Sequence, residues 1–154
     1  MNVRKSDVKN VREVLCVINR SNAEAYRKII PQEFFKEPVF TYDELLKKFK
    51  EMTFYSYELK GEIVGVAALQ VESECLGNVR FVYVLPEHQR KGVGTSLVTY
   101  IEAEARKLKL EALRVPYVDI NAYWAINFYT KLGYKVVDKR RKPSGYDLLF
   151  KKVL

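Results

Sequence analysis

One segment near the middle of the chain constrains the fold most: an apolar strand that leads through a basic, glycine-bearing loop into a helix. The strand is expected over residues 78–85, and the loop carries Arg90, Lys91, Gly92 and Gly94. Glycines let a backbone approach a ligand closely. Free N–H groups at the start of the following helix attract anions. The segment therefore predicts a phosphate cradle, most naturally for a diphosphate.

Two better-known phosphate-binding loops do not fit this segment. The Walker A loop needs glycine, four residues and then Gly-Lys-Ser or Gly-Lys-Thr, and the sequence has no such run. The dinucleotide fingerprint needs a third glycine where this chain has Leu97, and the strands expected before it are antiparallel. On the glycines alone, a glycine-containing turn before an ordinary helix remains the alternative.

Hydrophobic periodicity, capping boxes and turn residues predict the other elements. After a short N-terminal strand, helices are expected over residues 8–18, 21–30 and 41–52. A hairpin of strands 54–59 and 63–71 leads to strand 78–85, helix 93–108, strand 112–117, helix 122–132, and strands 134–137 and 146–150. The capping boxes are Ser21–Glu24 and Thr41–Glu44. This order indicates an α+β fold with one mostly antiparallel sheet and helices on its faces.

The net charge of +8 favours an anionic partner, which includes nucleic acid, an acidic membrane surface and a phosphate-bearing small molecule. Most of the excess lies toward the two ends of the chain, because residues 51–100 carry more acidic than basic side chains. The densest basic run, Lys139–Lys142, is expected to be a solvated turn between the last two strands. The phosphate cradle must then work mainly through backbone amides.

Cysteine and histidine usage argues against a metal site. Cys16 and Cys75 share no ligand spacing, and His88 is the only histidine, so no metal is expected. Two thiols without a disulfide framework suit a reducing compartment. No signal peptide or apolar stretch of membrane-spanning length is present, so we expect a cytoplasmic protein without a membrane partner. At 154 residues, we expect one domain over residues 1–154.

Two motifs resemble the GNAT superfamily of N-acetyltransferases. Residues 89–94 (QRKGVG) match the pattern Q/R-x-x-G-x-G/A, and Val84-Leu85-Pro86-Glu87 before them is typical of the same motif. Residues 125–134 (AINFYTKLGY) are similar to the later motif A-I-x-F-Y-x-K-L-G-F. The resemblance implies a three-layer α/β/α fold whose mixed, mostly antiparallel sheet of about six or seven strands is splayed between strands 4 and 5.

The resemblance also implies roles in binding acetyl-CoA as cosubstrate. Val82, Tyr83 and Val84 would lie beside the pantetheine arm, and the amide of Val84 would polarise the thioester carbonyl. The residues that would hold the pyrophosphate are Arg90, Lys91, Gly92, Val93, Gly94 and Thr95.

Tyr129 matches the family tyrosine that protonates the departing CoA thiolate; its alternative role is that of an aromatic core residue. Asn121 stands one residue before the family position of an asparagine that contacts the CoA arm, which here is Ala122. Asn121 is therefore a candidate CoA ligand or, alternatively, the cap of the helix that follows.

The sequence does not assign the general base or the acceptor pocket to particular residues. Tyr117 stands where some family members have a catalytic glutamate, so Glu72, Glu74, Asp119 and water remain candidates for the base. In this fold the segment between the first helices and the second strand usually shapes the acceptor pocket. Its aromatic residues would line that pocket and its carboxylates would bind a cationic amine; alternatively, the aromatic residues pack in the core and the carboxylates are solvated at the surface. Its residues of interest are Tyr26, Glu33, Phe34, Phe35, Glu37, Phe40 and Tyr42.

Together these features predict an acyltransferase, an acetyl-CoA-dependent N-acetyltransferase. It would move an acetyl group to a primary amine of a small molecule, protein or peptide by direct attack in a ternary complex. The alternative is a non-catalytic acyl-CoA-binding or sensing module. No nucleic-acid-binding motif accompanies the basic residues, so no nucleic acid is expected. The resemblance leaves a homodimer open.

Overall fold

A mixed seven-stranded sheet in the order β1-β2-β3-β4-β5-β7-β6 organises the computed structural model, which describes residues 2–154. Among the strands of these residues, the β4–β5 pair is parallel and the other pairs are antiparallel. The strands are β1 (Val3–Lys5), β2 (Thr53–Leu59), β3 (Glu62–Val71), β4 (Leu76–Val84), β5 (Ala112–Asp119), β6 (Lys135–Lys142) and β7 (Gly145–Val153). The helices are α1 (Val11–Tyr26), α2 (Tyr42–Glu51), α3 (Val93–Lys107) and α4 (Tyr123–Lys131). Short 3₁₀ turns are η1 (Val8–Asn10), η2 (Gln32–Phe34) and η3 (Pro86–His88).

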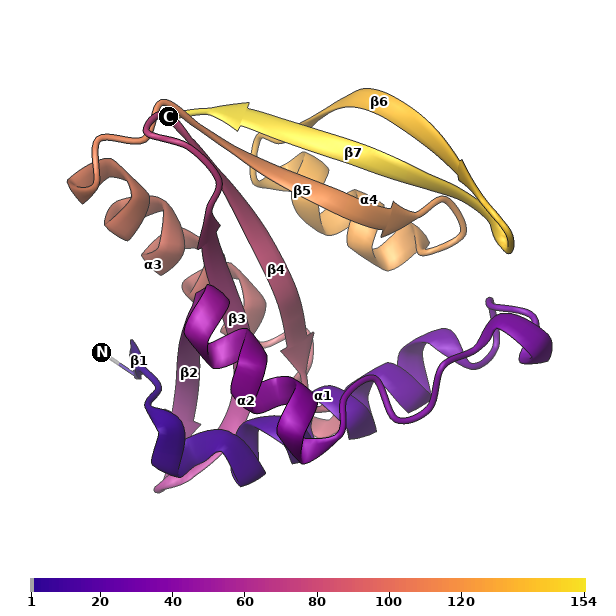
Figure 1. The fold of residues 1–154 in the computed structure, drawn as a ribbon, viewed down its shortest axis with the longest axis horizontal. Coiled ribbons are helices and arrows are strands. Elements are labelled where there is room, and N and C mark those ends of the chain that lie inside the picture. Colours follow the sequence, from indigo (N-terminus) through magenta and orange to yellow (C-terminus); the bar gives the residue numbers. More distant parts are fainter. Residues whose placement is uncertain (1) are drawn as a thin grey trace.

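Alternating side chains on the central strands build two hydrophobic cores, one on each face of the sheet. Phe54 and Val66 pack with α1 and α2. Their neighbours Tyr55 and Ala67 pack on the opposite face with α3 and α4. Because successive strand residues point to opposite faces, one apolar strand supplies both cores. The predicted α+β fold with three layers, α/β/α, is confirmed (Figure 1).

The sheet opens between β4 and β5. These strands are paired only from Leu76–Asn78 to Ala112–Arg114, and beyond that point they diverge (Figure 1). A bulge then bends β4, because Phe81 adopts a left-handed φ of 53° at the break in the β3–β4 register. Bulges bend a strand and increase its local twist. The predicted splay between strands 4 and 5 is confirmed.

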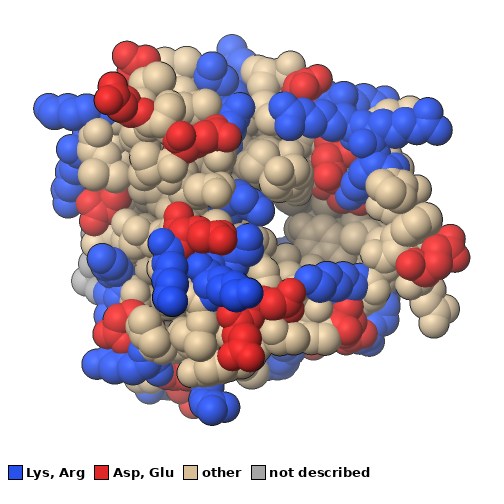
Figure 2. All heavy atoms as spheres, in the orientation of Figure 1, with Lys and Arg blue, Asp and Glu red and all other residues tan. Residues whose placement is uncertain are grey.

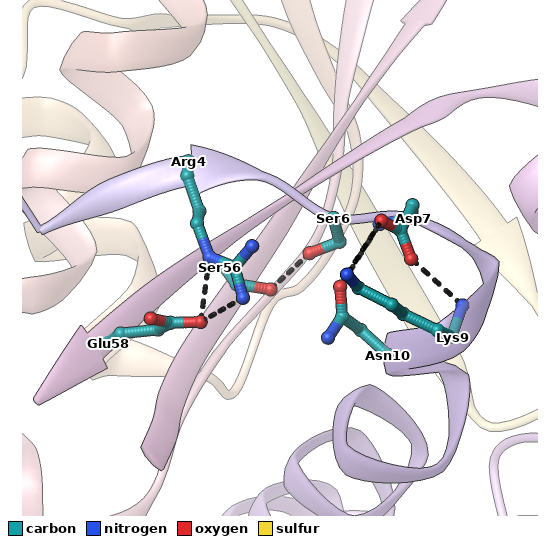
Figure 3. Close-up of polar contacts among 7 residues, drawn as sticks. All are labelled: Arg4, Ser6, Asp7, Lys9, Asn10, Ser56 and Glu58. Atoms are coloured by element: carbon teal, nitrogen blue, oxygen red, sulfur yellow. Dashed lines mark hydrogen bonds and ion pairs between the residues drawn. The ribbon is translucent and has the colours of Figure 1, made fainter. Parts of the chain in front are cut away.

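Polar contacts hold the N-terminal strand and the start of the first helix (Figure 3). Arg4 Nε donates a hydrogen bond to Glu58 Oε1 at 2.7 Å, which ties β1 to β2. The buried hydroxyls of Ser6 and Ser56 bond each other. Asp7 caps η1 through its side chain, so the predicted helix over 8–18 begins as a 3₁₀ turn before it becomes α1.

One predicted helix boundary is wrong. The Ser21–Glu24 capping box does not start a new helix, because α1 continues through it to Tyr26. Buried Val14, Val17 and Ile18 hold this helix against the sheet, and tertiary packing of an apolar face overrides a local capping signal. The Thr41–Glu44 box is confirmed, since each residue's side chain accepts a hydrogen bond from the other's backbone amide.

The basic run is also placed differently from the expectation. Lys139–Lys142 belongs to β6, an outer strand, and the turn comes only after Lys142. Arg140 and Arg141 lie opposite Asp147 and Tyr146 in the β6–β7 ladder. The ladder thus extends through the charged residues. The side chains of Lys139, Arg140 and Arg141 are exposed and that of Lys142 is half-buried, while the backbone pairs with β7. Among residues 2–154, no helix has the length and apolar character needed to span a membrane.

Candidate active site

A cavity of about 460 Å³ occupies the space where β4 and β5 diverge. It is lined by β4 and β5, the start of α3, one face of α4 and the C-terminal turns of α1. Figure 2 shows a hollow at this place, with charged side chains at its rim and uncharged atoms within. The opening of the sheet therefore creates a space large enough to bind a ligand.

The loop before α3 presents unpaired backbone donors to this cavity. Gly92 is the N-cap of α3 with a left-handed φ of 82°, and it has no side chain with which to cap the helix. Throughout residues 2–154, no backbone amide from Arg90 to Thr95 donates a hydrogen bond to another residue. The first amides of a helix have no partner within the helix, and together with the helix dipole they form a favourable site for an anion, so this row can donate hydrogen bonds to a phosphate-bearing ligand.

Most of the residues predicted for cofactor binding lie together around the cavity. Lys91 and Asn121 do not belong to its lining. The predicted residues that line it are Val82, Tyr83, Val84, Arg90, Gly92, Val93, Gly94, Thr95 and Tyr129.

The alternative role of Asn121 as a helix cap is wrong. Ala122 is the N-cap of α4, and no side chain within residues 2–154 caps this helix. The backbone amide of Asn121 instead donates to Asp119 Oδ1 at 2.8 Å. Asp119 at the end of β5 therefore shapes the turn into α4, and this leaves the Asn121 side chain exposed.

The backbone of β4 turns one amide toward the cavity. Leu85 N donates to Val64 O at 2.9 Å, so the amide of Leu85 faces β3. Because N–H groups alternate along a strand, the amide of the preceding Val84 points away from β3, into the space that β5 has left. The carbonyl of Val84 faces the same way and accepts a hydrogen bond from Gln89 Nε2 at 3.0 Å.

Tyr129 is buried in α4 and lines the cavity. Its ring packs edge-on against Phe128, with centroids 5.0 Å apart, and its phenol makes no hydrogen bond within residues 2–154. Burial, followed by the neighbouring Tyr26 and Tyr83, raises the pKa of Tyr129 well above its usual value. The phenol therefore keeps its proton at neutral pH and has a free O–H to donate.

Sequence reasoning missed several residues of the lining, among them Ser21, His88 and Trp124. Ser21 Oγ and His88 Nδ1 are buried without a hydrogen-bond partner among the described residues. Trp124 of α4 meets Tyr26 of α1 edge to face, with ring centroids 5.4 Å apart. No motif marks these positions, because the contact between α1 and α4 depends on long-range folding.

The candidate bases are engaged elsewhere. Glu72 forms an ion pair with Arg114, and Asp119 forms one with Lys142. Glu74 is exposed and is not part of the lining. Tyr117 lines the cavity, and no carboxylate does so among residues 2–154. Nor do these residues contain a cluster of His, Cys, Asp and Glu side chains that could hold a metal ion.

The aromatic residues considered for an acceptor pocket separate in the structure. Tyr26 lines the cavity, whereas Phe40 is buried in the core beneath α1 and α2. Phe34 is exposed, and Glu37 forms an ion pair with Arg27 at 2.6 Å. Only the C-terminal end of α1 in this segment therefore faces the site.

Comparisons with known proteins agree with this geometry. A crystal structure of the PaiA N-acetyltransferase from Thermoplasma acidophilum, in complex with coenzyme A, matches with a TM-score of 0.86 at 20% identity, covering 99% of this chain and 98% of that one. The ribosomal-protein-S18-alanine N-acetyltransferase from Escherichia coli matches with a TM-score of 0.78 at 16% identity, covering 98% and 92%. These likenesses show a shared fold.

Sequence similarity is more direct. An uncharacterized N-acetyltransferase of Chlorobaculum tepidum is 30% identical over 91 residues, which are 59% of this chain and 55% of the relative. The chain thus spans about half the length of this curated relative. The family model described as "Acetyltransferase (GNAT) family" matches residues 18–134, which include the α3 loop, the opening of the sheet and Tyr129. On this match, the chain belongs to the GNAT family of acetyltransferases.

Proposed function

We propose that the protein transfers an acetyl group from acetyl-CoA to a primary amine by direct attack in a ternary complex. The observation that carries the proposal is the row of unpaired amides from Arg90 to Thr95 beside a cavity that the splayed sheet opens. The family membership supports the reaction type. The bound coenzyme A of the Thermoplasma acidophilum relative supports the cosubstrate.

The loop before α3 fits a diphosphate. Its amides supply hydrogen bonds to phosphate oxygens, and the N-terminal end of a fifteen-residue helix adds a favourable dipole. Arg90 lines the cavity and contributes a positive charge, and Lys91 adds another next to it. At Gly92 the left-handed backbone leaves open space where a Cβ would stand. The residues present therefore suit the pyrophosphate of acetyl-CoA.

The free edge of β4 fits the pantetheine arm. An extended chain with amide groups can pair with an exposed strand edge as another strand would. Val82, Tyr83 and Val84 line the cavity where β5 no longer pairs with β4. The arm would thereby lead from the α3 loop toward the inside of the sheet.

The thioester supplies an activated acetyl group, and the chain's own residues stabilise the charges of its transfer. The amine nitrogen forms the new C–N bond as the C–S bond breaks, and the amine gives up one proton overall, which the departing sulfur gains. The Val84 amide, directed into the cavity, would stabilise the negative charge on the carbonyl oxygen. The Tyr129 phenol would donate its proton to the departing sulfur, since its raised pKa keeps it protonated until negative charge develops there.

Release of free CoA thiol in the presence of acetyl-CoA and a panel of amines, peptides and proteins tests this proposal. Amine-dependent release at a rate above that of acetyl-CoA hydrolysis is the expected result. The second candidate is a non-catalytic acyl-CoA sensor, which is favoured by the absence of carboxylates from the described lining. Tight CoA binding without turnover of any member of the panel would favour the sensor over the enzyme.

The single domain, the cytoplasmic location and a homodimer stay predictions.

A further inference from the structure

A second, smaller cavity of about 180 Å³ adjoins the first and shares Tyr26, Tyr83 and Tyr117 with it. We propose that this cavity holds the second cationic group of the acceptor, so that the substrate is a small aliphatic amine with a further ammonium or guanidinium group, bound by Asp147 beside Asp119. The proposal rests on the proposed function, because it assigns the acceptor of that reaction.

The position of the cavity suits the far end of an acceptor. Three tyrosines form a common wall, so a flexible chain can lie in both spaces at once. Its reactive amine would then reach the larger cavity while its other end stays in the smaller one. The volume admits a small end group. Asn22 and Ile30 complete the wall on the side of the first helix.

The cavity contains a pair of carboxylates that needs a cation. Asp119 of β5 and Asp147 of β7 lie directly opposite each other in the antiparallel ladder. Like charges in this arrangement repel and destabilise the strand pair. Lys142 relieves the repulsion, because its ammonium donates to Asp119 Oδ2 at 2.8 Å and to Asp147 Oδ1 at 2.6 Å. The carboxylates thus already form a cation-binding site, and a chain lysine occupies part of it.

The pair retains capacity for one more cation. Arg140 lies opposite Asp147 in the β6–β7 ladder and forms an ion pair with Asp138, so the three carboxylates, one ammonium and one guanidinium of this region leave a net charge of −1. Asp119 Oδ1 is taken by the amide of Asn121, whereas Asp147 Oδ2 accepts no hydrogen bond from any residue in 2–154. The Asp119 and Asp147 side chains are only 7% and 16% exposed, so water screens their charge weakly. The free oxygen of Asp147 is the natural partner for an acceptor ammonium next to Lys142.

The negative charge of Asp119 and Asp147 acts on Tyr26, which lies where the two cavities meet. Burial first, and then the charges of Asp119 and Asp147, raise the pKa of Tyr26 to about 12. Tyr26 lines both spaces, so a cation that passes along it experiences the same field. Aromatic rings add attraction for a cation that reaches their faces. This local environment contrasts with the overall charge of +8, which by itself would repel a cationic substrate.

Three amines with the same spacer of four methylene groups test the inference, because they differ only at the end remote from the reacting nitrogen. They are 1,4-diaminobutane, 1-aminopentane and 5-aminopentanoate, which end in a cation, a methyl group and an anion. We expect kcat/KM for the diamine to exceed that for the other two by about tenfold or more, as for a hydrogen bond to a charged group. Equal values for the three amines would overturn the inference.

Variants of this chain test which residues cause the preference for the diamine. Asp147→Asn is expected to lower kcat/KM for the diamine about tenfold more than for 1-aminopentane. Lys142→Met is expected to lower KM for the diamine, because it leaves both carboxylates without a cation. Asp43→Asn is the matched control, since Asp43 is an exposed aspartate of α2 outside both cavities. A diamine preference that survives Asp147→Asn, or that Asp43→Asn removes equally, would contradict the assignment.

A calorimetric titration separates this inference from the proposed function. Here 1,4-diaminobutane is added to the protein saturated with CoA, with and without Asp147→Asn. Binding that the variant loses, without turnover of any amine, would uphold the cation site and overturn the acetyltransferase. Turnover of all three amines at one rate would uphold the acetyltransferase and overturn the cation site. Neither binding nor turnover would overturn both.

Discussion

Gly94 of α3 lies so close to Phe128 of α4 that a Cβ on Gly94 would stand 3.2 Å from two carbons of the Phe128 ring. Both residues line the larger cavity. The spacing is tighter than an ordinary van der Waals contact, so α3 approaches α4 here only because residue 94 has no side chain. This close contact between α3 and α4 therefore lies at the border of the proposed CoA site.

Gly94→Ala is expected to displace Phe128 into the cavity and weaken CoA binding by about tenfold, or about 1.4 kcal/mol. The free energy of unfolding should change little, because alanine's better helix propensity offsets the contact by about 1 kcal/mol. Titration of CoA measures the first quantity and urea denaturation the second. Adding Phe128→Leu should restore much of the affinity; if the double variant binds as weakly as the single one, the contact is not the cause.

Gly92 and Gly61 form a matched pair of left-handed glycines, with φ of 82° and 81° and open space around the missing Cβ. Replacing either by alanine should lower the free energy of unfolding by roughly 1 kcal/mol, the cost of that backbone conformation for a residue with a Cβ. Only Gly92→Ala should also weaken CoA binding, because Gly61 lies in the β2–β3 turn. Equal CoA affinity for the two variants would show that Gly92 takes no part in CoA binding.

Tyr129→Phe should lower kcat by about a hundredfold while leaving CoA binding nearly intact, because it removes one positioned proton donor. Tyr134→Phe is the control. Tyr134 is a buried tyrosine whose ring centroid lies 5.8 Å from that of Tyr129, and its phenol donates to Glu102 at 2.8 Å. Its variant should lose about 1–3 kcal/mol of stability and retain kcat. Similar losses of kcat in both variants would indicate packing, not proton donation.

Alkaline pH should destabilise the fold through Tyr55, which faces α3. Burial, then the charge of Glu104 and the nearby Tyr100, raise the pKa of Tyr55 to about 12. The folded chain therefore holds this proton more tightly than the unfolded chain, whose tyrosines titrate near pH 10. The stability that the protonated phenol contributes is complete below about pH 10 and declines as pH rises toward 12, by up to about 1.4 kcal/mol per pH unit.

Urea denaturation between pH 9 and 11 measures this decline. Tyr55→Phe should make the decline shallower by up to about 1.4 kcal/mol per pH unit, since phenylalanine has no proton to lose, while other tyrosines with a raised pKa, such as Tyr26 and Tyr129, cause the rest. Parallel curves for the two proteins would show that Tyr55 does not cause the effect.

Local chemistry explains which parts of the site could be predicted from the sequence. Gly92 and Gly94 needed no tertiary information, because a strand, a short loop and a helix start are close in the chain. Ser21 misled the prediction, since its capping signal is as good as that of Thr41 but only packing decides that α1 continues past it. The Asp119–Asp147 pair could not be predicted, because it depends on the register between β5 and β7.

The point where β4 and β5 part has a consequence for solvent exchange. Their last register pair is Asn78 with Arg114, and Arg114 Nε also donates to Asn78 Oδ1 at 3.2 Å at the point where the divergence begins. Past that pair, β4 is an inner strand of the sheet whose outward amides, such as that of Val84, meet no strand. Deuterium should therefore enter Val84 quickly in the free protein and slowly once a ligand pairs with this edge. Exchange at this one amide would report whether the cavity is filled.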